Sequence, residues 1–219
     1  MSGESVVIVD YGLGNLFSVQ RALNLVGAGD AKISAEKEDI ENADRIVLPG
    51  VGAFGDGMKN LQELGLVSVL QEYAKSGRPL LGVCLGMQLI LSRSEEFGVH
   101  DGLNLIHGNV RRLESDSESD FKIPHIGWNT LEKPSEHSEQ TGLWDKTVLA
   151  DIDEGASMYF NHSFIVEPED PSVSLASTNY GNDVYCSVLK QGNITGAQFH
   201  PELSAADGLK LYRNFVQNF

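Results

Sequence analysis

The chain has 219 residues, of which 41% are hydrophobic and 21% charged, a balance typical of a folded domain with a sizeable core. Its 31 acidic and 16 basic residues give a formal net charge of -15, which argues against nucleic acid or an anionic membrane as a partner. No apolar stretch resembles a signal peptide or a transmembrane helix, and the two cysteines lie far apart. We therefore expect a reduced, soluble, cytoplasmic protein without a disulfide.

The N-terminal half alternates short apolar runs with amphipathic stretches. The runs predict buried strands over residues 6–10, 31–34, 45–50 and 78–83. Helical spacing predicts helices over residues 16–27, 54–64 and 66–75, the first of them stopped by Gly27. Strands and helices joined by short connections favour a parallel sheet covered by helices on both faces.

The second half changes character after residue 92. The acidic stretch ESDSESD (residues 114–120) predicts a solvated, mobile surface loop. Short strands between residues 159 and 198 predict a meander or mixed sheet, and residues 206–219 predict a closing helix with Leu209, Tyr212, Phe215 and Val216 on one face. Without an internal repeat or linker, the sequence predicts a single α/β domain over residues 1–219, with a mixed, mostly parallel central sheet.

The stretch PLLGVCLGMQLI (residues 79–90) places a cysteine between a buried strand and a helix. Glycines two positions either side of Cys84 allow the sharp turn of a nucleophile elbow, with cysteine in place of serine. The positive end of the following helix favours thiolate over thiol. The alternative is a buried core cysteine at a strand end.

The stretch TGAQFHPEL (residues 195–203) supplies an imidazole and a carboxylate. A cysteine nucleophile needs an imidazole to accept and return its proton, and a carboxylate fixes the tautomer of that imidazole. Residues two apart on an extended segment point the same way, so Glu202 can support His200. We therefore predict a Cys84–His200–Glu202 triad, the alternative for His200 being a surface histidine beside an acid.

Glycines after another buried strand, in LPGVGAFG (residues 48–55), predict backbone N–H groups for an oxyanion. The candidates are Gly50, Val51 and Gly52, and the alternative is an ordinary strand-to-helix turn. The stretch DYGLGN resembles a dinucleotide fingerprint, but Phe17 stands where the third glycine belongs, so NAD binding is rejected. No histidine spacing indicates a metal site, no cofactor is expected, and Cys186 is interpreted as a strand core residue.

Six motifs occur together in this chain: DYGLGNLFSV, LPGVGAFGDGM, GVCLGMQLI, PHIGWN, YFNHSF and GAQFHPE. In this order they resemble class I glutamine amidotransferases, and more narrowly the glutaminase subunits of imidazole glycerol phosphate synthases. The resemblance implies that Cys84 attacks the amide carbon of L-glutamine, and that His200, held by Glu202, protonates the departing ammonia. It further implies that Gln88, His162 and Ser163 contact the substrate glutamine. Without the motif, Gln88 would be assigned to an exposed helix face.

The resemblance also implies a partner. Family members form a heterodimer with a (β/α)₈ cyclase or synthase subunit, which uses the ammonia to form imidazole glycerol phosphate in histidine biosynthesis. Two positions depart from the family pattern: Leu203 replaces a lysine in HPEKS, and Asn161 replaces a valine in YFVHS.

Three alternatives stay open at this point. A paralogous subunit would supply ammonia to a cyclase-like partner that modifies a surface-polysaccharide sugar. A non-catalytic binding module on the same fold, and a generic cysteine hydrolase or peptidase, are the others.

Overall fold

The computed structural model describes residues 5–114, 121–137 and 139–217. Most of the acidic loop predicted over residues 114–120 therefore lies outside the described residues. The helices are α1 (Leu16–Leu25), α2 (Lys37–Asn42), α3 (Phe54–Glu63), α4 (Val67–Lys75), α5 (Leu85–Leu89) and α6 (Ala205–Gln217), with 3₁₀ turns η1 (Ser135–His137), η2 (Pro171–Val173) and η3 (Pro201–Leu203). The strands are β1 (Val6–Val9), β2 (Lys32–Ser34), β3 (Arg45–Gly50), β4 (Leu80–Cys84), β5 (Arg93–Ser94), β6 (His100–Asp101), β7 (Gly108–Arg112), β8 (His125–Thr130), β9 (Ser157–His162), β10 (Phe164–Pro168), β11 (Ser174–Tyr180), β12 (Asp183–Gln191) and β13 (Ile194–Ala197).

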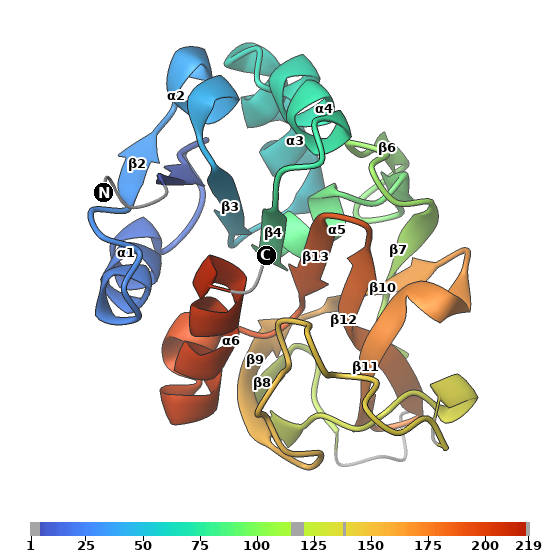
Figure 1. Ribbon diagram of the computed structural model, residues 1–219. Coiled ribbons are helices and arrows are strands. Elements are labelled where there is room, and N and C mark those ends of the chain that lie inside the picture. Colours follow the sequence, from blue (N-terminus) through green and yellow to red (C-terminus); the bar gives the residue numbers. More distant parts are fainter. Residues whose placement is uncertain (1–4, 115–120, 138, 218–219) are drawn as a thin grey trace.

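The central sheet has a parallel part and a largely antiparallel part (Figure 1). Strands β2, β1, β3, β4 and β13 lie side by side and are parallel to one another. From β13 the order continues to β12, β10 and β7 through antiparallel pairs, with β11 added on β12. The switch from parallel to antiparallel pairing at β13 places the late strands beside the N-terminal strands.

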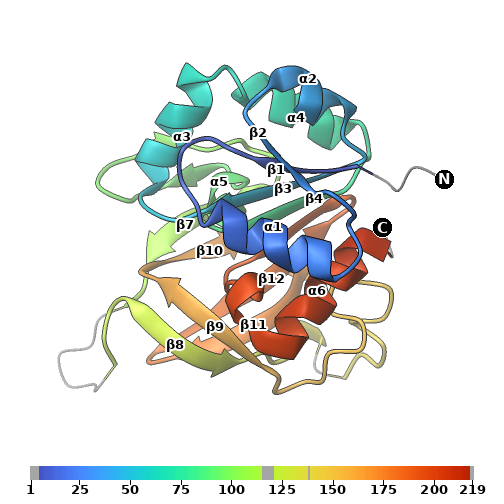
Figure 2. The same cartoon turned by 90° about the vertical axis from the view of Figure 1, so that its left-hand side faces the viewer.

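Helices cover both faces of the parallel part (Figure 2). Helices α2, α3 and α4 lie on one face, and α1 and α6 lie on the other. The separate two-stranded ribbon β8–β9 packs on the side of α6, where Met158 and Phe160 join the buried cluster that contains Tyr212. The layers therefore confirm the predicted α/β class with a mixed sheet.

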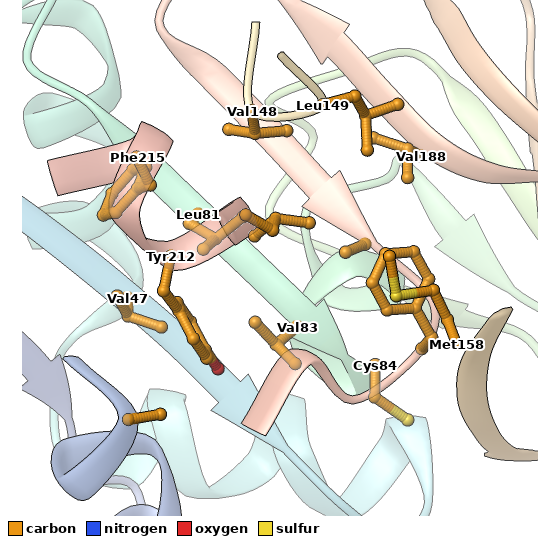
Figure 3. Close-up of a cluster of buried hydrophobic side chains, with 14 of the residues drawn as sticks. Val47, Leu81, Val83, Cys84, Val148, Leu149, Met158, Val188, Tyr212 and Phe215 are labelled. Atoms are coloured by element: carbon orange, nitrogen blue, oxygen red, sulfur yellow. The ribbon is translucent and has the colours of Figure 1, made fainter. Parts of the chain in front are cut away.

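Strand β4 lies at the centre of the parallel part, between β3 and β13. Leu81 and Val83 pack toward Tyr212 and Phe215 of α6 (Figure 3), whereas Leu80 faces the cluster on the α3–α4 side. Burying a side chain of this size stabilises the fold by roughly 1.5–3 kcal/mol. Packing on both faces of β4 thus fixes this strand up to its last residue, Cys84.

Most predicted N-terminal elements are present within one or two residues of their predicted bounds. Helix α2 was missed because it is short and buries only Ile40. On α6, Tyr212 and Phe215 are buried as predicted, and Leu211, which was not predicted, is buried with them. Cys84 and Cys186 are both free and buried. None of the helices in the described part of the chain combines the length and the apolar character that a membrane crossing requires.

Candidate functional site

Cys84 occupies a strained turn between β4 and α5. Its backbone has φ 52° and ψ -109°, a conformation that costs a residue with a Cβ about 1–3 kcal/mol. A Cβ on Gly82 would lie 2.7 Å from the carbonyl oxygen of Gly86, and a Cβ on Gly86 would collide with the carbonyl oxygen of Leu48. Only glycine at these two positions lets the chain turn this closely, as the nucleophile-elbow interpretation requires.

The parallel pairing of β4 with β13 brings His200 to the same edge of the sheet as Cys84. The register pairs Val83 with Ala197, so Cys84 is the last residue of β4 and His200 comes a few residues after the end of β13. The carboxyl ends of neighbouring parallel strands lie at the same edge of a sheet, and this edge is where α/β proteins form their ligand sites. Sheet topology therefore unites two residues that are distant in the sequence.

The His200 imidazole forms a buried ion pair with Glu202. His200 Nδ1 lies 2.9 Å from Glu202 Oε1, and both side chains are almost fully buried. Burial disfavours the charged imidazolium, but the side chains of Cys84 and Glu202 stabilise it more strongly and raise the pKa of His200 to about 10. With Nδ1 committed to Glu202, Nε2 is the nitrogen available to the thiol.

The backbone between His200 and Glu202 differs from the prediction. Pro201–Leu203 form a 3₁₀ turn, whereas the sequence was interpreted as an extended segment. The Leu203 N–H donates to the His200 carbonyl oxygen at 3.0 Å. The turn, rather than strand alternation, therefore folds Glu202 back beneath the imidazole. The Tyr212 hydroxyl donates to the other carboxylate oxygen at 3.2 Å.

A cavity of about 240 Å³ opens beside Cys84. Its walls come from five segments: the loop after β3, Cys84 with the start of α5, Glu96 after β5, Pro124 before β8, and the end of β9 with the start of β10. The lining residues are Val51, Gly52, Cys84, Leu85, Gln88, Glu96, Pro124, Asn161, His162, Ser163 and Phe164. Six of the predicted site residues are among them, and Gly50, His200 and Glu202 are not.

The oxyanion candidates divide into two groups. Val51 and Gly52 line the cavity, and Gly52 has φ 113°, a left-handed conformation that favours glycine. Gly50 lies behind them, packed so closely against the Tyr11 hydroxyl and Leu85 that a Cβ would collide. The backbone N–H of Leu85, the residue after the nucleophile, was not predicted but is the usual second donor in such an elbow.

The predicted substrate contacts Gln88, His162 and Ser163 all border the cavity. Gln88 is 5% exposed rather than on an exposed helix face, and its Nε2 donates to the Phe164 carbonyl oxygen at 2.9 Å and to Gln198 Oε1 at 3.3 Å. Both ring nitrogens of His162 are engaged by other protein groups, Phe164 O and Tyr185 Oη. A ligand would therefore meet the backbone of residues 161–164 rather than the His162 ring.

One buried carboxylate in the cavity was missed. Glu96 is 8% exposed, and its Oε2 accepts the Phe54 N–H at 2.6 Å. Burial raises the pKa of Glu96, although the Phe54 hydrogen bond opposes this. The sequence does not indicate this role, because Glu96 lies in an irregular segment after β5, where no periodic pattern marks a buried position. A buried carboxylate facing a cavity suits a cationic group of a ligand.

The arrangement defines a class of enzyme. Acyl transfer through a thioester needs three parts, and all are present here: a thiol at a strained elbow, an imidazole whose pKa is raised by that thiol and by a buried carboxylate, and backbone N–H groups around a cavity. Within residues 5–114, 121–137 and 139–217, no group of three histidine, cysteine or acidic residues is arranged to hold a metal ion.

Comparison with known proteins narrows this class. The model of the class I glutamine amidotransferase family matches residues 7–219. The imidazole glycerol phosphate synthase subunit HisH 1 of Legionella pneumophila (strain Paris) is 47% identical over 97% of this chain and 99% of the relative. The subunit HisH of Aquifex aeolicus (strain VF5) is 46% identical over 95% of this chain and 94% of the relative.

Solved structures agree on the fold. A crystal structure of a glutamine amidotransferase matches with a TM-score of 0.71 at 20% identity, covering 97% of this chain and 98% of that chain. The glutaminase domain of Trypanosoma brucei CTPS, with bound acivicin, matches with a TM-score of 0.64 at 16% identity, over 97% and 92% of the two chains. The chain therefore belongs to the class I glutamine amidotransferases and, among them, to the family of imidazole glycerol phosphate synthase HisH subunits.

Proposed function

We propose that this chain hydrolyses the side-chain amide of L-glutamine to glutamate and ammonia, as the glutaminase subunit of an imidazole glycerol phosphate synthase in histidine biosynthesis. The observation that carries the proposal is the strained Cys84 at the end of β4 beside the buried His200–Glu202 pair. The names of its relatives favour this pathway over a polysaccharide-linked paralogue. The amidotransferase domain would span residues 1–219.

Cys84 is the nucleophile in this proposal. Its thiol gives its proton to His200 Nε2 and the sulfur attacks the amide carbon of glutamine. The carbonyl oxygen becomes an oxyanion bound by backbone N–H groups of Leu85 and the 51–52 loop. His200 is protonated at neutral pH because its pKa is raised to about 10. It passes the Nε2 proton to the departing nitrogen, so the C–N bond breaks and leaves ammonia and a thioester. Neutral His200 then takes a proton from the water that hydrolyses the thioester.

Glutamine would enter the cavity with its α-ammonium group near the carboxylate of Glu96. The ammonium would bring an opposite charge next to this buried group, whose hydrogen bond from the Phe54 N–H is uncharged. Gln88 and the backbone of residues 161–164 would position the rest of the substrate.

The partner in this proposal is a (β/α)₈ cyclase subunit that binds as a heterodimer and consumes the ammonia. Ile126 and Trp128 point outward from β8 and are 59% and 56% exposed, which is unusual for large apolar side chains on one short strand. Leu203 is 43% exposed next to Glu202 and offers apolar contact where the family has lysine. A cytoplasmic setting suits the two free cysteines.

Ammonia release from glutamine by the purified chain, alone and with a candidate cyclase, tests the proposal. Cys84→Ser should abolish turnover, and a glutamine-analogue electrophile such as 6-diazo-5-oxo-L-norleucine should label Cys84 alone. Absence of both turnover and labelling with the cyclase present would refute it in favour of a non-catalytic binding module. Turnover of peptides but not glutamine would point to a peptidase.

A further inference from the structure

A line of buried hydrogen bonds leads from β8 to the wall of the cavity. His162 Nδ1 lies 3.0 Å from the Phe164 carbonyl oxygen, and its Nε2 lies 3.2 Å from the Tyr185 hydroxyl. The same hydroxyl lies 3.1 Å from His125 Nδ1. His125 Nε2 faces the side-chain amide of Asn129 at 3.5 Å. Of the three residues that form its centre, His125, His162 and Tyr185, none is more than 6% exposed.

Only one arrangement of protons satisfies this line. Burial lowers the pKa of His125 to about 4 and that of His162 to about 3, so each imidazole carries one N–H at neutral pH. A carbonyl oxygen can only accept, so His162 Nδ1 carries its proton and Nε2 accepts from Tyr185. The tyrosine oxygen is then the acceptor for His125 Nδ1–H, and His125 Nε2 accepts from Asn129.

Stacking against aromatic side chains also fixes the His125 ring. The His125 ring is stacked between Tyr180, with centroids 3.8 Å apart, and Phe160, with centroids 4.9 Å apart. A ring clamped on both faces keeps its nitrogens in the plane of its partners. At the other end, the Phe164 carbonyl oxygen also accepts from Gln88 Nε2. The line therefore ends at the Phe164 carbonyl group, which links α5 to the start of β10.

We infer that His125 and Tyr185 are positioning residues that hold the 161–164 wall of the glutamine cavity through the ring of His162. This inference rests on the proposed function and adds two residues that touch neither the substrate nor Cys84. Without the Tyr185 hydroxyl, His125 loses an acceptor and His162 loses a donor, although both side chains stay buried. The His162 ring is then held only by the Phe164 carbonyl oxygen, and the wall that meets glutamine is less firmly fixed.

Tyr185→Phe removes this hydroxyl, and Tyr180→Phe is the matched control. Tyr180 also packs on His125, but its hydroxyl donates to the Lys122 carbonyl oxygen at 2.7 Å, outside the line. The measurement is the rate of Cys84 labelling by 6-diazo-5-oxo-L-norleucine as a function of its concentration. We expect Tyr185→Phe to weaken half-saturation about tenfold, or ~1.4 kcal/mol, with the maximal rate within threefold of the unmodified chain. Tyr180→Phe should change neither quantity.

The tautomers give a second readout that general destabilisation does not produce. In ¹⁵N NMR spectra of the full chain, His125 and His162 should both carry the proton on Nδ1, the less common tautomer of a free imidazole. An Nε2–H tautomer at either residue, or equal half-saturation in Tyr185→Phe and Tyr180→Phe, would overturn the inference. Failure of the unmodified chain to react at all would instead refute the proposed function.

Discussion

Replacing Glu202 with glutamine tests whether the buried carboxylate holds His200 in its charged form. The substitution keeps the size of the side chain and removes its charge. An amide can also turn its N–H₂ group toward His200 Nδ1, which would force the proton onto Nε2 and remove the base that the thiol needs. We expect turnover to fall while the fold is retained.

The size of the effect follows from the pKa of His200. Its rise from 6.5 to about 10 corresponds to roughly 5 kcal/mol of preference for the imidazolium. Glu202 supplies part of this preference and Cys84 the rest. If the transition state loses roughly 2–3 kcal/mol with the carboxylate, the rate falls about 10²-fold. The wrong tautomer adds to this, and the corresponding Asp→Asn change in a serine protease costs about 10⁴-fold. The expected fall lies between these values.

Steady-state ammonia release and an NMR titration of His200 measure the two parts of the effect. Tyr212→Phe is the control, because it removes one hydrogen bond to the same carboxylate but leaves the charge of Glu202 and its contact with His200 in place. In the unmodified chain, the stability from the raised pKa is fully present below pH 6.5 and is lost as the pH rises through about 10. Turnover of Glu202→Gln within fivefold of the unmodified chain would refute the reasoning.

Three further predictions concern the elbow and the surface. Cys84→Gly should unfold at a higher temperature than Cys84→Ala, because φ 52° strains alanine but not glycine; the reverse order would contradict the strained elbow. Gly86→Ala should lower the free energy of unfolding in urea by more than ~2 kcal/mol and suppress labelling of Cys84, since the new Cβ collides with the Leu48 carbonyl; normal labelling would argue against this turn. Trp128→Ala should weaken cyclase binding at least about tenfold in calorimetry and leave labelling of the isolated chain unchanged; unaltered affinity would place the interface elsewhere.

The elements around Cys84 could be predicted because their signals are local. Continuous apolar runs mark strands buried on both faces, and the glycines of GVCLG mark a sharp turn wherever they occur. The register that pairs Val83 with Ala197 has no such local signal. The chemistry of their side chains predicts that Cys84 and His200 act together. Whether they lie close in space depends on which strands are neighbours, and the packing of the whole sheet decides that order.

The misses have physical causes of the same kind. Glu96 became a site residue because an irregular segment folds over the start of α3, where its carboxylate accepts the Phe54 N–H. Without its motif, Gln88 would be assigned to an exposed helix face, but α5 has only five residues and all of them are buried. In both cases the burial comes from segments far away in the sequence, and local periodicity does not report it.

The strain at Cys84 persists because its position is determined from several sides. Strand β4 is flanked by two parallel neighbours, and every one of its residues is buried, so relaxing φ would break packing on both faces. His200 is fixed by the strand next to β4 and by the turn that carries Glu202. The walls of the cavity differ, because Val51, Gly52 and Ser163 lie between elements. A partner that changes the rate of glutamine hydrolysis would therefore act on these connections, and the contact between sulfur and imidazole would stay the same.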